Sequence, residues 1–376
     1  MIYKKYGSTG IDVSAIGFGG MRFDNPADID SNAALLLAAY KAGINYFDTA
    51  PQYCDDKSEP IFGAALKQML KTRGKKPFYV STKSMKDKPE DLRRELEKSL
   101  TRLGLDCIDF YHFWCVIRME SYLHRKNNGI LKEFEKLKDK GLIKHICIST
   151  HLPGTEIEKV LEDYPFEGVL LGYSAMNFAY RDKGLDAAAR LKRGVVVMNP
   201  LGGGIIPQNP ERFEFVKTQK KETVTQAALR FLINDNRINV TLVGFTTHKH
   251  LKEAIEAVDG FKPIGADKIE QIRAGVKHSF DQLCTGCRYC DNCPQGIEVP
   301  RMMDVYNHKI LTGKDKAIID RLTWHWNIDL ENNYLDKCTN CGLCEAACTQ
   351  RLPIRDRLKE IRGVVKEHLI NKDKKN

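Results

Sequence analysis

The stretch DLRRELEKSLTRLGLDCIDFYHFWCV, residues 91–116, contains one helix and one strand of the repeat that decides the fold. Its helical half places four leucines on one face, at Leu92, Leu96, Leu100 and Leu103. Gly104 follows as a natural end of that helix, because glycine readily adopts the left-handed conformation of a C-terminal cap. The almost continuous apolar run at 108–116 then predicts a strand buried on both faces, as in a parallel sheet.

The same alternation of strand and helix recurs between about residues 14 and 260. Further apolar runs, each followed by a segment of helical character, lie at 15–20, 45–50, 77–83, 145–150, 168–174, 194–200 and 240–245. Eight strand–helix repeats in about 250 residues predict an α/β fold of the closed (β/α)₈ kind, a TIM barrel. A doubly wound open sheet is the alternative, but the G-x-G-x-x-G expected after its first strand is missing.

The strand pattern stops after about residue 265. The segment ADKIEQIRAGVKHSF, residues 266–280, predicts a helix that closes the barrel, and the rest of the chain is helical or loop around cysteines. We therefore expect two domains, a barrel over residues 1–275 and a small, mainly helical domain over residues 276–376.

Composition and charge limit the class of protein. The chain has 376 residues, of which 42% are hydrophobic and 29% charged, as in soluble globular proteins. Neither a signal peptide nor an apolar run of about 18 residues is evident, so we expect a cytoplasmic protein without a membrane span. The net charge of +10 comes without a nucleic-acid-binding motif. A basic surface suits an acidic redox partner or a phosphate-bearing cofactor.

Eight of the twelve cysteines form two dense runs after residue 283. The first run reads C-x2-C-x2-C-x2-C-P and the second C-x2-C-x2-C-x3-C, at Cys284, Cys287, Cys290, Cys293, Cys338, Cys341, Cys344 and Cys348. Twelve cysteines in a cytoplasmic chain favour metal ligation over disulfides. Triplets at this spacing predict two [4Fe–4S] clusters, whereas structural zinc, the alternative, usually takes separated C-x2-C pairs.

In two-cluster ferredoxins the fourth ligand of each cluster often comes from the other run. On that pattern Cys348 completes the first triplet and Cys293 completes the second. The first run has a short final gap, and the second has Thr349 where proline is usual. These two irregularities bear on the pairing of ligands rather than on the metal.

The predicted barrel strands end in side chains that can handle a proton. Asp48 ends one strand, Tyr53 follows five residues later, and Lys83 ends the next strand. A charged lysine lowers the pKa of a neighbouring tyrosine, and the aspartate holds that lysine charged and in place. The alternative is a packed tyrosine beside a structural ion pair.

Several segments, in the right order, resemble aldo-keto reductases. NYFDTAPQYCDDKSEPIFGAALK (45–67) resembles the signature segment of that family, and FYVSTKS (78–84) resembles its catalytic-lysine strand. VVVMNPLGGGII (195–206) and TLVGFTTHKHLKEAIEA (241–257) resemble its late cofactor-binding segments. The likeness covers about residues 3–275, and the cysteine-rich end resembles the iron–sulfur extension of one branch.

The resemblance implies hydride transfer between a nicotinamide dinucleotide and a small carbonyl or alcohol substrate. It makes Tyr53 the general acid and Asp48 and Lys83 the residues that tune it. The resemblance places the family's histidine of the strand at 108–116 at the position that Trp114 occupies here. His112 lies two positions earlier on the same strand face. Either His112 serves the site, or Trp114 replaces the histidine and the carbonyl site is altered.

The resemblance also implies cofactor contacts. Ser149 and Thr150 match the pair that holds the carboxamide, whereas the family glutamine corresponds to Leu170. Loops after the last two strands are expected to bind phosphate, through Gly202, Gly203, Gly244, Thr246, Thr247 and His250. Lys249 and His250 stand near the position that reads the adenosine 2′-phosphate, which favours NADP(H) over NAD(H).

A difficulty in electron count leaves three functional interpretations open. A nicotinamide moves two electrons as hydride, whereas an iron–sulfur cluster moves one at a time, and proteins usually join the two with a flavin. The chain is then a carbonyl reductase or alcohol dehydrogenase with structural or regulatory clusters, or a flavin-containing enzyme that exchanges electrons with a ferredoxin-like carrier. The third interpretation is a redox-sensing or electron-carrying subunit that is not itself an enzyme. Oxygen-sensitive clusters suggest an anaerobic cell.

Overall fold

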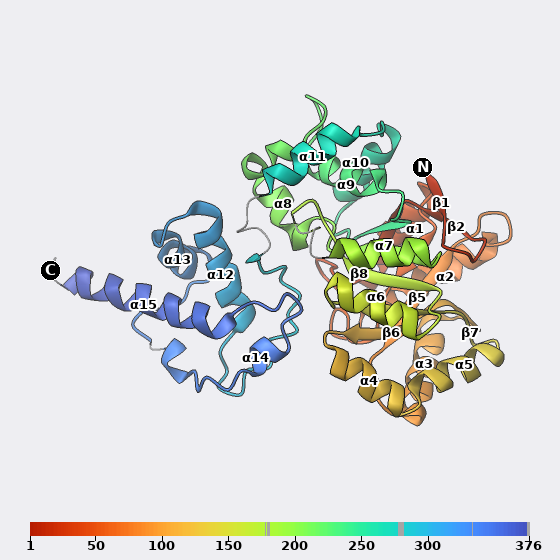
Figure 1. Ribbon diagram of the computed structural model, residues 1–376, viewed down its shortest axis with the longest axis horizontal. Coiled ribbons are helices and arrows are strands. Elements are labelled where there is room, and N and C mark those ends of the chain that lie inside the picture. Colours follow the sequence, from red (N-terminus) through yellow and green to blue (C-terminus); the bar gives the residue numbers. More distant parts are fainter. Residues whose placement is uncertain (177, 179–180, 277–281, 333, 374–376) are drawn as a thin grey trace. The chain divides into compact units, whose positions relative to one another are not determined.

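We describe a computed structural model of the chain, which covers residues 1–376 except 177, 179–180, 277–281, 333 and 374–376. The chain divides into two compact units (Figure 1). The first unit is Met1–Gly202 with Ile206–Gly275, and the second is Gly203–Ile205 with Val276–Asn376. The last residues of the helix expected over 266–280 lie outside the described residues.

The first unit contains a closed parallel barrel with the strand order β10-β3-β4-β5-β6-β7-β8-β9. Its strands are β3 Ile16–Gly19, β4 Tyr46–Asp48, β5 Tyr79–Ser84, β6 Ile108–Val116, β7 Ile143–Thr150, β8 Gly168–Gly172, β9 Gly194–Met198 and β10 Val240–Val243. Each strand coincides with one of the eight apolar runs in the sequence. The predicted (β/α)₈ barrel is therefore confirmed, and the open doubly wound sheet is excluded.

Helices follow the barrel strands along the chain and are coloured orange to green in Figure 1. They are α1 Ile29–Lys41, α2 Ser58–Met69, α3 Pro89–Leu103, α4 Met119–Asn127, α5 Ile130–Asp139, α6 Gly154–Asp163, α7 Asp182–Arg190, α8 Ile205–Gln208, α9 Val224–Asn234, α10 His248–Asp259 and α11 Ala266–Gly275. Short 3₁₀ turns lie at η1 Leu70–Thr72, η3 Gly202–Gly204, η4 Pro210–Arg212 and η5 Glu214–Val216. No helix among the described residues has both the length and the apolar character that crossing a membrane requires.

Helix α3 shows how the local sequence sets these boundaries. Pro89 opens the helix, at a position where its missing N–H costs nothing. Gly104 ends it with a φ of 65°, in the left-handed conformation expected of a glycine cap. Leu92, Leu96 and Leu103 are buried, so the leucine face packs inward as predicted.

A hairpin that was not predicted, β1 Tyr3–Lys5 and β2 Asp12–Ser14, precedes the barrel. Between its strands, Tyr6 is fully buried among the interior side chains of the barrel. Gly168 and Gly194 start neighbouring strands and are register partners. A Cβ atom on either glycine would lie 2.1 Å or 2.2 Å from the nearest atom of the Tyr6 side chain. The Tyr6 ring therefore fills the amino-terminal end of the barrel, and glycine at both positions makes room for it.

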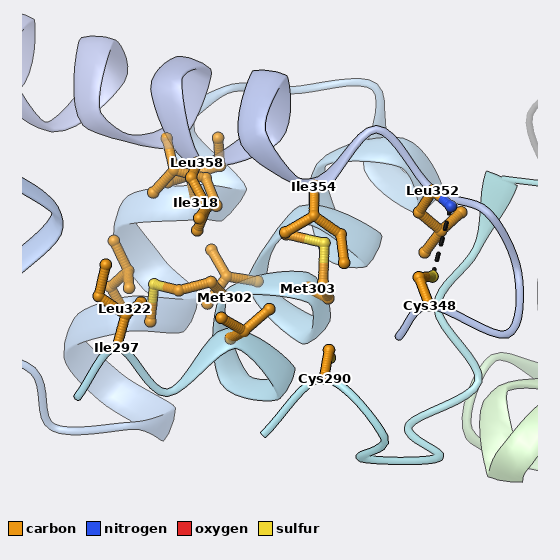
Figure 2. Close-up of a cluster of buried hydrophobic side chains, with 13 residues drawn as sticks. Cys290, Ile297, Met302, Met303, Ile318, Leu322, Cys348, Leu352, Ile354 and Leu358 are labelled. Atoms are coloured by element: carbon orange, nitrogen blue, oxygen red, sulfur yellow. Dashed lines mark hydrogen bonds between the residues drawn. The ribbon is translucent and has the colours of Figure 1, made fainter. Parts of the chain in front are cut away.

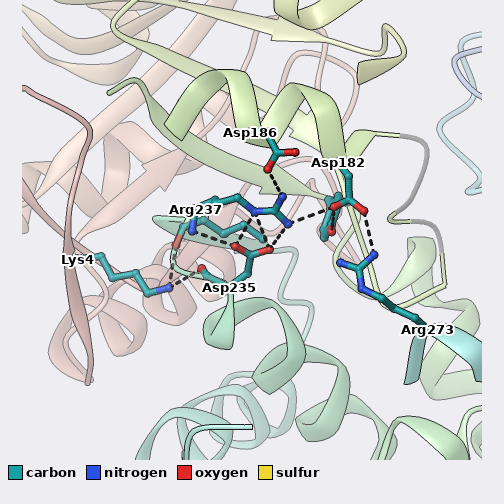
Figure 3. A network of polar contacts seen from close by, with 8 residues as sticks. Lys4, Asp182, Asp186, Asp235, Arg237 and Arg273 are labelled. Carbon is teal, nitrogen blue, oxygen red and sulfur yellow. Dashed lines mark hydrogen bonds and ion pairs between the residues drawn. The ribbon is translucent and has the colours of Figure 1, made fainter. Parts of the chain in front are cut away.

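A polar network joins the hairpin to three later elements of the same unit (Figure 3). Asp182, the first residue of α7, accepts hydrogen bonds from Tyr173, Arg237 and Arg273 at 2.6, 3.1 and 2.9 Å. Lys4 Nζ donates to three backbone carbonyls at the turn between α9 and β10, at 2.7, 3.1 and 2.8 Å. Burial lowers the pKa of Lys4 to about 8. The network holds α7, α11 and this turn together.

The second unit is helical around a small core (Figure 2). Its elements are α12 Val299–Thr312, α13 Lys316–Asp320, the π-helical turn η7 Arg321–His325, η8 Tyr334–Lys337, α14 Leu343–Ala346 and α15 Ile354–Asp373. Met302, Met303, Ile318, Ile354 and Leu358 pack together, and Cys290 and Cys348 lie in the same cluster. The indole N–H of Trp326 donates to Asp304 at 2.9 Å, whereas Trp324 is 88% exposed.

Candidate functional site

Two buried charges of opposite sign meet at the ends of neighbouring strands. Asp48 ends β4 and Lys83 lies near the end of β5, and both side chains are at most 3% exposed. Lys83 Nζ donates to both carboxylate oxygens of Asp48, at 2.6 and 2.7 Å. The Ser81 hydroxyl adds a third hydrogen bond to Asp48, at 2.7 Å. Three hydrogen bonds to one carboxylate fix the lysine at the carboxyl-terminal rim of the barrel, where TIM-barrel active sites form.

Ser81 is a site residue that the sequence analysis missed. It lies two positions before Lys83 on β5, so strand alternation puts both side chains on the inner face. The alternation of side chains along the predicted strand was the signal that would have found it.

Tyr53 lies above this ion pair on a loop of unusual backbone conformation. The Nζ of Lys83 is 5.3 Å from the centroid of the Tyr53 ring. Gln52, Cys54, Asp55 and Asp56 all have positive φ values, between 54° and 68°. Non-glycine residues rarely adopt this conformation, and they persist in it where the surroundings hold them. The Gln52 N–H donates to the Asp56 carboxylate at 2.8 Å, and the Ser58 N–H donates to the Tyr53 carbonyl at 3.2 Å.

The Tyr53 phenol is protonated in this arrangement. Burial raises its pKa well above the ordinary value of 10.0, and the Asp48 carboxylate raises it further. The net shift of the Tyr53 pKa is therefore upward, opposite to the lowering expected from the Lys83 charge alone. Burial also lowers the pKa of Lys83, and Asp48 opposes that shift. The neutral Tyr53 phenol can therefore donate its proton. The lysine beside it is charged and paired with Asp48.

His112 and Trp114 lie on β6 at different depths. His112 is the register partner of Lys83 and is completely buried. Neither of its ring nitrogens makes a hydrogen bond of normal geometry among the described residues. Burial, together with the Lys83 charge, lowers the pKa of His112 to about 3, so its ring is neutral.

Trp114, rather than His112, lies against Tyr53. The two rings meet edge to face, with centroids 5.6 Å apart and planes at 85°. The pairing of β6 with β7 shifts register between Phe113 and Val116, and Cys115 within this bulge has a φ of 59°. Bulges of this kind redirect side chains next to active sites.

Ser149 and Thr150, the pair expected to hold the carboxamide, differ in whether their hydroxyl groups are already hydrogen-bonded. Ser149 and Thr150 end β7 and are almost fully buried. The Thr150 hydroxyl donates its hydrogen to the Val116 carbonyl at 3.0 Å and accepts from the Leu152 N–H at 3.1 Å. Leu170, at the position of the family glutamine, packs into the apolar barrel interior. Of the pair, Ser149 is therefore the one whose hydroxyl makes no hydrogen bond with the backbone of the described residues.

The expected phosphate-binding residues lie in two turns. Gly202, Gly203 and Gly204 have φ values of 61°, 70° and 102° and form η3. Thr247 caps α10 by accepting a hydrogen bond from the His250 N–H at 3.2 Å. The Thr246 hydroxyl lies 2.9 Å from His250 Nδ1. Gly244 precedes these residues, next to β10. A capped helix start with exposed N–H groups suits an anion.

One set of four cysteines gathers in the core of the second unit. Cys290 and Cys348 are buried in the same cluster, and Cys284 packs against it. Cys287 Sγ lies 3.3 Å from the Thr349 hydroxyl, next to Cys348. Backbone N–H groups of Gly286 and Leu352 donate to the sulfurs of Cys284 and Cys348, at 3.4 and 3.3 Å (Figure 2 shows the second of these bonds). Such donors stabilise thiolates, which are the ligands of iron–sulfur clusters.

The other four cysteines line one pocket of the second unit. Cys293 comes from the first run, and Cys338, Cys341 and Cys344 come from the second. Ile297, Val299 and Leu358 form its apolar base. Within the described residues, no three Cys, His, Asp or Glu side chains have the spacing for a single metal ion.

Two family models match the chain, one for each of its parts. The model described as "Aldo/keto reductase family" matches residues 15–276, and the model described as "4Fe-4S dicluster domain" matches residues 283–353.

The chain is also similar to curated proteins and solved structures. It is 29% identical to L-galactose dehydrogenase of Arabidopsis thaliana over 308 residues, which is 73% of this chain and 95% of that protein. It is 25% identical to "Probable aldo-keto reductase 1" of Glycine max over 299 residues, 68% of this chain and 83% of that protein. The holo structure of aldo-keto reductase AKR11C1 from Bacillus halodurans has the same fold, with a TM-score of 0.62 and 20% identity, covering 74% of this chain and 97% of that one.

Proposed function

Since the chain belongs to the aldo/keto reductase family and carries a 4Fe-4S dicluster domain after its barrel, we propose that it is an NAD(P)-dependent oxidoreductase of aldo/keto reductase type. Its substrate is a small carbonyl compound or the corresponding alcohol. The likeness to L-galactose dehydrogenase supports a substrate of this class. The barrel over residues 1–275 performs the reaction, and residues 276–376 hold two [4Fe–4S] clusters.

The observation that carries this proposal is the arrangement of Asp48, Lys83 and Tyr53. A bound nicotinamide supplies or accepts hydride at the substrate carbon. In the reducing direction, Tyr53 gives its phenolic proton to the carbonyl oxygen as that oxygen gains charge. Lys83, held by both carboxylate oxygens of Asp48 at 2.6 and 2.7 Å, stabilises the tyrosinate that remains. In the oxidising direction the same phenolate takes the proton back.

The cofactor residues of the barrel fit an NADP(H) molecule in part. The Ser149 hydroxyl is available for a carboxamide at the rim. The turns at Gly202–Gly203 and Gly244–Thr247 offer backbone N–H groups to phosphates. His250, with Lys249 beside it, supports NADP(H) over NAD(H), because the additional 2′-phosphate of NADP(H) favours nearby basic groups.

The cysteines fit two clusters that take ligands from both runs. We assign Cys284, Cys287, Cys290 and Cys348 to an inner set, and Cys293, Cys338, Cys341 and Cys344 to an outer set. The inner set rests on the electrostatic coupling of its sulfurs, which raise one another's pKa, and on its N–H donors to sulfur, and the outer set rests on its shared pocket. Cysteines that bind such clusters must stay reduced, and the cytoplasm is a reducing compartment.

The proposal is tested with a Tyr53→Phe variant, purified without oxygen so that its clusters stay intact. Consumption of NADPH with a panel of aldehydes and ketones is expected to fall by a factor of about 100 or more. Tyr46→Phe is the matched control, because the Tyr46 hydroxyl is buried without a hydrogen-bond partner among the described residues. Equal turnover in wild type and Tyr53→Phe would exclude Tyr53 as the general acid.

A second candidate function is favoured by two apolar substitutions at family contact positions. Trp114 lies against Tyr53 where the family has a histidine, and Leu170 packs in the barrel where it has a glutamine. A flavin in the barrel would let the nicotinamide and the clusters exchange electrons. Mass spectrometry of the small molecules released on denaturation decides between the two. Flavin in a near one-to-one ratio supports the electron-transfer enzyme, and its absence supports the carbonyl reductase.

The third interpretation, a redox-sensing or electron-carrying subunit without activity, has less support. The described residues keep Asp48, Lys83 and Tyr53 together at the barrel rim. Burying an ion pair costs free energy, because both charges are removed from water. A sensor without activity would have no use for such a pair below a tyrosine.

A further inference from the structure

The two sets of cysteines differ in their access to solvent. In the inner set Cys290 and Cys348 are buried, and in the outer set Cys341 is exposed. Electron transfer between proteins weakens steeply as the separation of the redox groups grows. An external electron carrier would therefore exchange electrons through the outer set, whose ligands reach the surface.

The surface beside the outer set has an apolar centre. Leu343 is 56% exposed, and it follows Gly342, whose φ of 77° turns the chain at this point. Leu343 lies between two ligands of the outer set, Cys341 and Cys344, and lines the same pocket. An exposed apolar side chain next to a metal ligand offers an apolar contact to a partner that approaches the cluster.

A basic rim surrounds this centre. Lys337 directly precedes the ligand Cys338, is exposed, and makes no ion pair among the described residues. Arg355 lines the pocket and is exposed, although it also pairs with Glu345 at 2.7 Å. Arg351 and Lys359 are exposed nearby in the sequence, as are the acidic Asp336, Asp356 and Glu360. The described residues that line the pocket, however, include Arg355 and no acidic residue. The chain as a whole has a net charge of +10, so the local and the overall charge agree in sign.

We propose that the surface formed by Lys337, Cys341, Leu343 and Arg355 is the docking site for an acidic protein that carries one electron at a time. The proposal rests on the proposed function, since it assumes a [4Fe–4S] cluster on the outer set. On docking, the reduced carrier loses one electron to that cluster and no bond is formed or broken. The reverse transfer uses the same contact. Charge complementarity speeds the encounter, and Leu343 gives the contact its apolar centre.

Trp324 is the main competing candidate for a docking residue. It is 88% exposed, more than Leu343, and aromatic side chains are frequent in interfaces. However, it lies on η7, a segment without cysteines, and the described residues show no ligand of either set beside it. A carrier docked there would have no cluster ligand at its contact point. Trp324 therefore serves as the control position.

The test measures binding of an acidic plant-type [2Fe–2S] ferredoxin to the anaerobically purified holoprotein by calorimetry at several salt concentrations. Lys337→Glu and Leu343→Asn are each expected to raise Kd by about 10-fold or more. Trp324→Ala and Lys316→Glu, which change exposed residues away from the outer set, are expected to change Kd by less than about twofold. Absorbance and electron paramagnetic resonance spectra check that the clusters of every variant are intact.

The outcomes separate this proposal from the proposed function. Binding that is insensitive to salt, unchanged in Lys337→Glu and Leu343→Asn, or lost in Trp324→Ala would overturn the docking site. Failure of the ferredoxin to bind the wild-type protein would overturn it as well. The Tyr53→Phe variant is expected to lose substrate turnover while it binds the ferredoxin normally. Loss of turnover in Tyr53→Phe together with normal binding by the docking variants would leave the reductase function standing alone.

Discussion

The hydroxyl oxygen of Thr349 lies 3.3 Å from the sulfur of Cys287, although 62 positions separate the two residues. Thr349 is 1% exposed, and it stands where comparable cysteine runs usually have proline. Proline has no side-chain donor, whereas the threonine hydroxyl can donate to a thiolate. The contact therefore links the two cysteine runs and gives the inner set a hydrogen bond to sulfur.

Replacing Thr349 with valine is expected to lower the reduction potential of the cluster on the inner set. A hydrogen bond to sulfur stabilises the reduced, more negative cluster, and its net value of about 1 kcal/mol corresponds to about 40 mV for one electron. A redox titration followed by electron paramagnetic resonance measures the shift. Thr349→Ser, which keeps the hydroxyl, and Thr339→Val, beside Cys338, serve as controls. An unchanged potential in Thr349→Val would show that the hydroxyl does not act on the cluster.

Lys83→Met is expected to destabilise the barrel by about 3–5 kcal/mol, because it leaves the Asp48 carboxylate buried without its cation. The double variant Asp48→Asn with Lys83→Met should regain much of that loss, since neither charge then remains. Urea unfolding measures both. The exposed pair of Lys5 with Asp12, at 2.8 Å, provides the control, and Lys5→Met should cost less than about 1 kcal/mol. A double variant as unstable as the sum of its single changes would contradict the coupling.

Gly168→Ala is expected to destabilise the protein by about 1–3 kcal/mol through overpacking against Tyr6. The added methyl group would lie 2.1 Å from the Tyr6 hydroxyl oxygen. Combining it with Tyr6→Leu should cost less than the two single changes together, because the smaller side chain leaves room. Gly74→Ala is the control, since its Cβ would meet nothing within 4 Å. Thermal unfolding of the single and double variants measures these changes in stability. Additive losses in the double variant would contradict a direct contact between the two positions.

Acid should destabilise the barrel through His112. Its pKa is about 3 in the folded chain against 6.5 when unfolded, so the unfolded chain binds the proton first. The stabilisation is complete above pH 6.5 and is lost as the pH falls from 6.5 towards 3, by on the order of a few kcal/mol. The His112→Gln variant should lose less stability than the wild type as the pH falls, as measured by hydrogen exchange in peptides from β4–β6. The His124→Gln variant, which changes an exposed histidine, should lose as much stability as the wild type. An equal loss in His112→Gln would show that His112 does not cause the acid destabilisation.

Much of the barrel was readable from the sequence because its strands are apolar on both faces and its helices carry clear stop signals. The eight runs and the glycine stop at Gly104 are of this kind. The hairpin at Tyr3–Ser14 was not, because strands of three residues carry too little periodicity to recognise. The bulge at Cys115 depends on how β6 pairs with β7, which no local pattern encodes.

Three members of the candidate site were expected from the sequence, whereas Ser81 was missed and the electrostatics depend on the fold. Strand ends and spacing pointed to Asp48, Tyr53 and Lys83. The direction of the Tyr53 pKa shift is set first by burial and then by the Asp48 carboxylate, and both depend on the folded structure. Likewise, His112 and Trp114 share a strand face in the sequence, and only their depths in the barrel distinguish them.

The Tyr6 ring that fills the end of the barrel also constrains the order of events during synthesis. Tyr6 leaves the ribosome well before Gly168 and Gly194, which make room for it. The hairpin must therefore wait, unfolded or loosely held, until β8 and β9 exist. A fusion partner at the N-terminus that restrains the hairpin would delay this last closure. With the hairpin restrained in this way, β8 and β9 would become resistant to protease more slowly, while the final stability of the protein would change little.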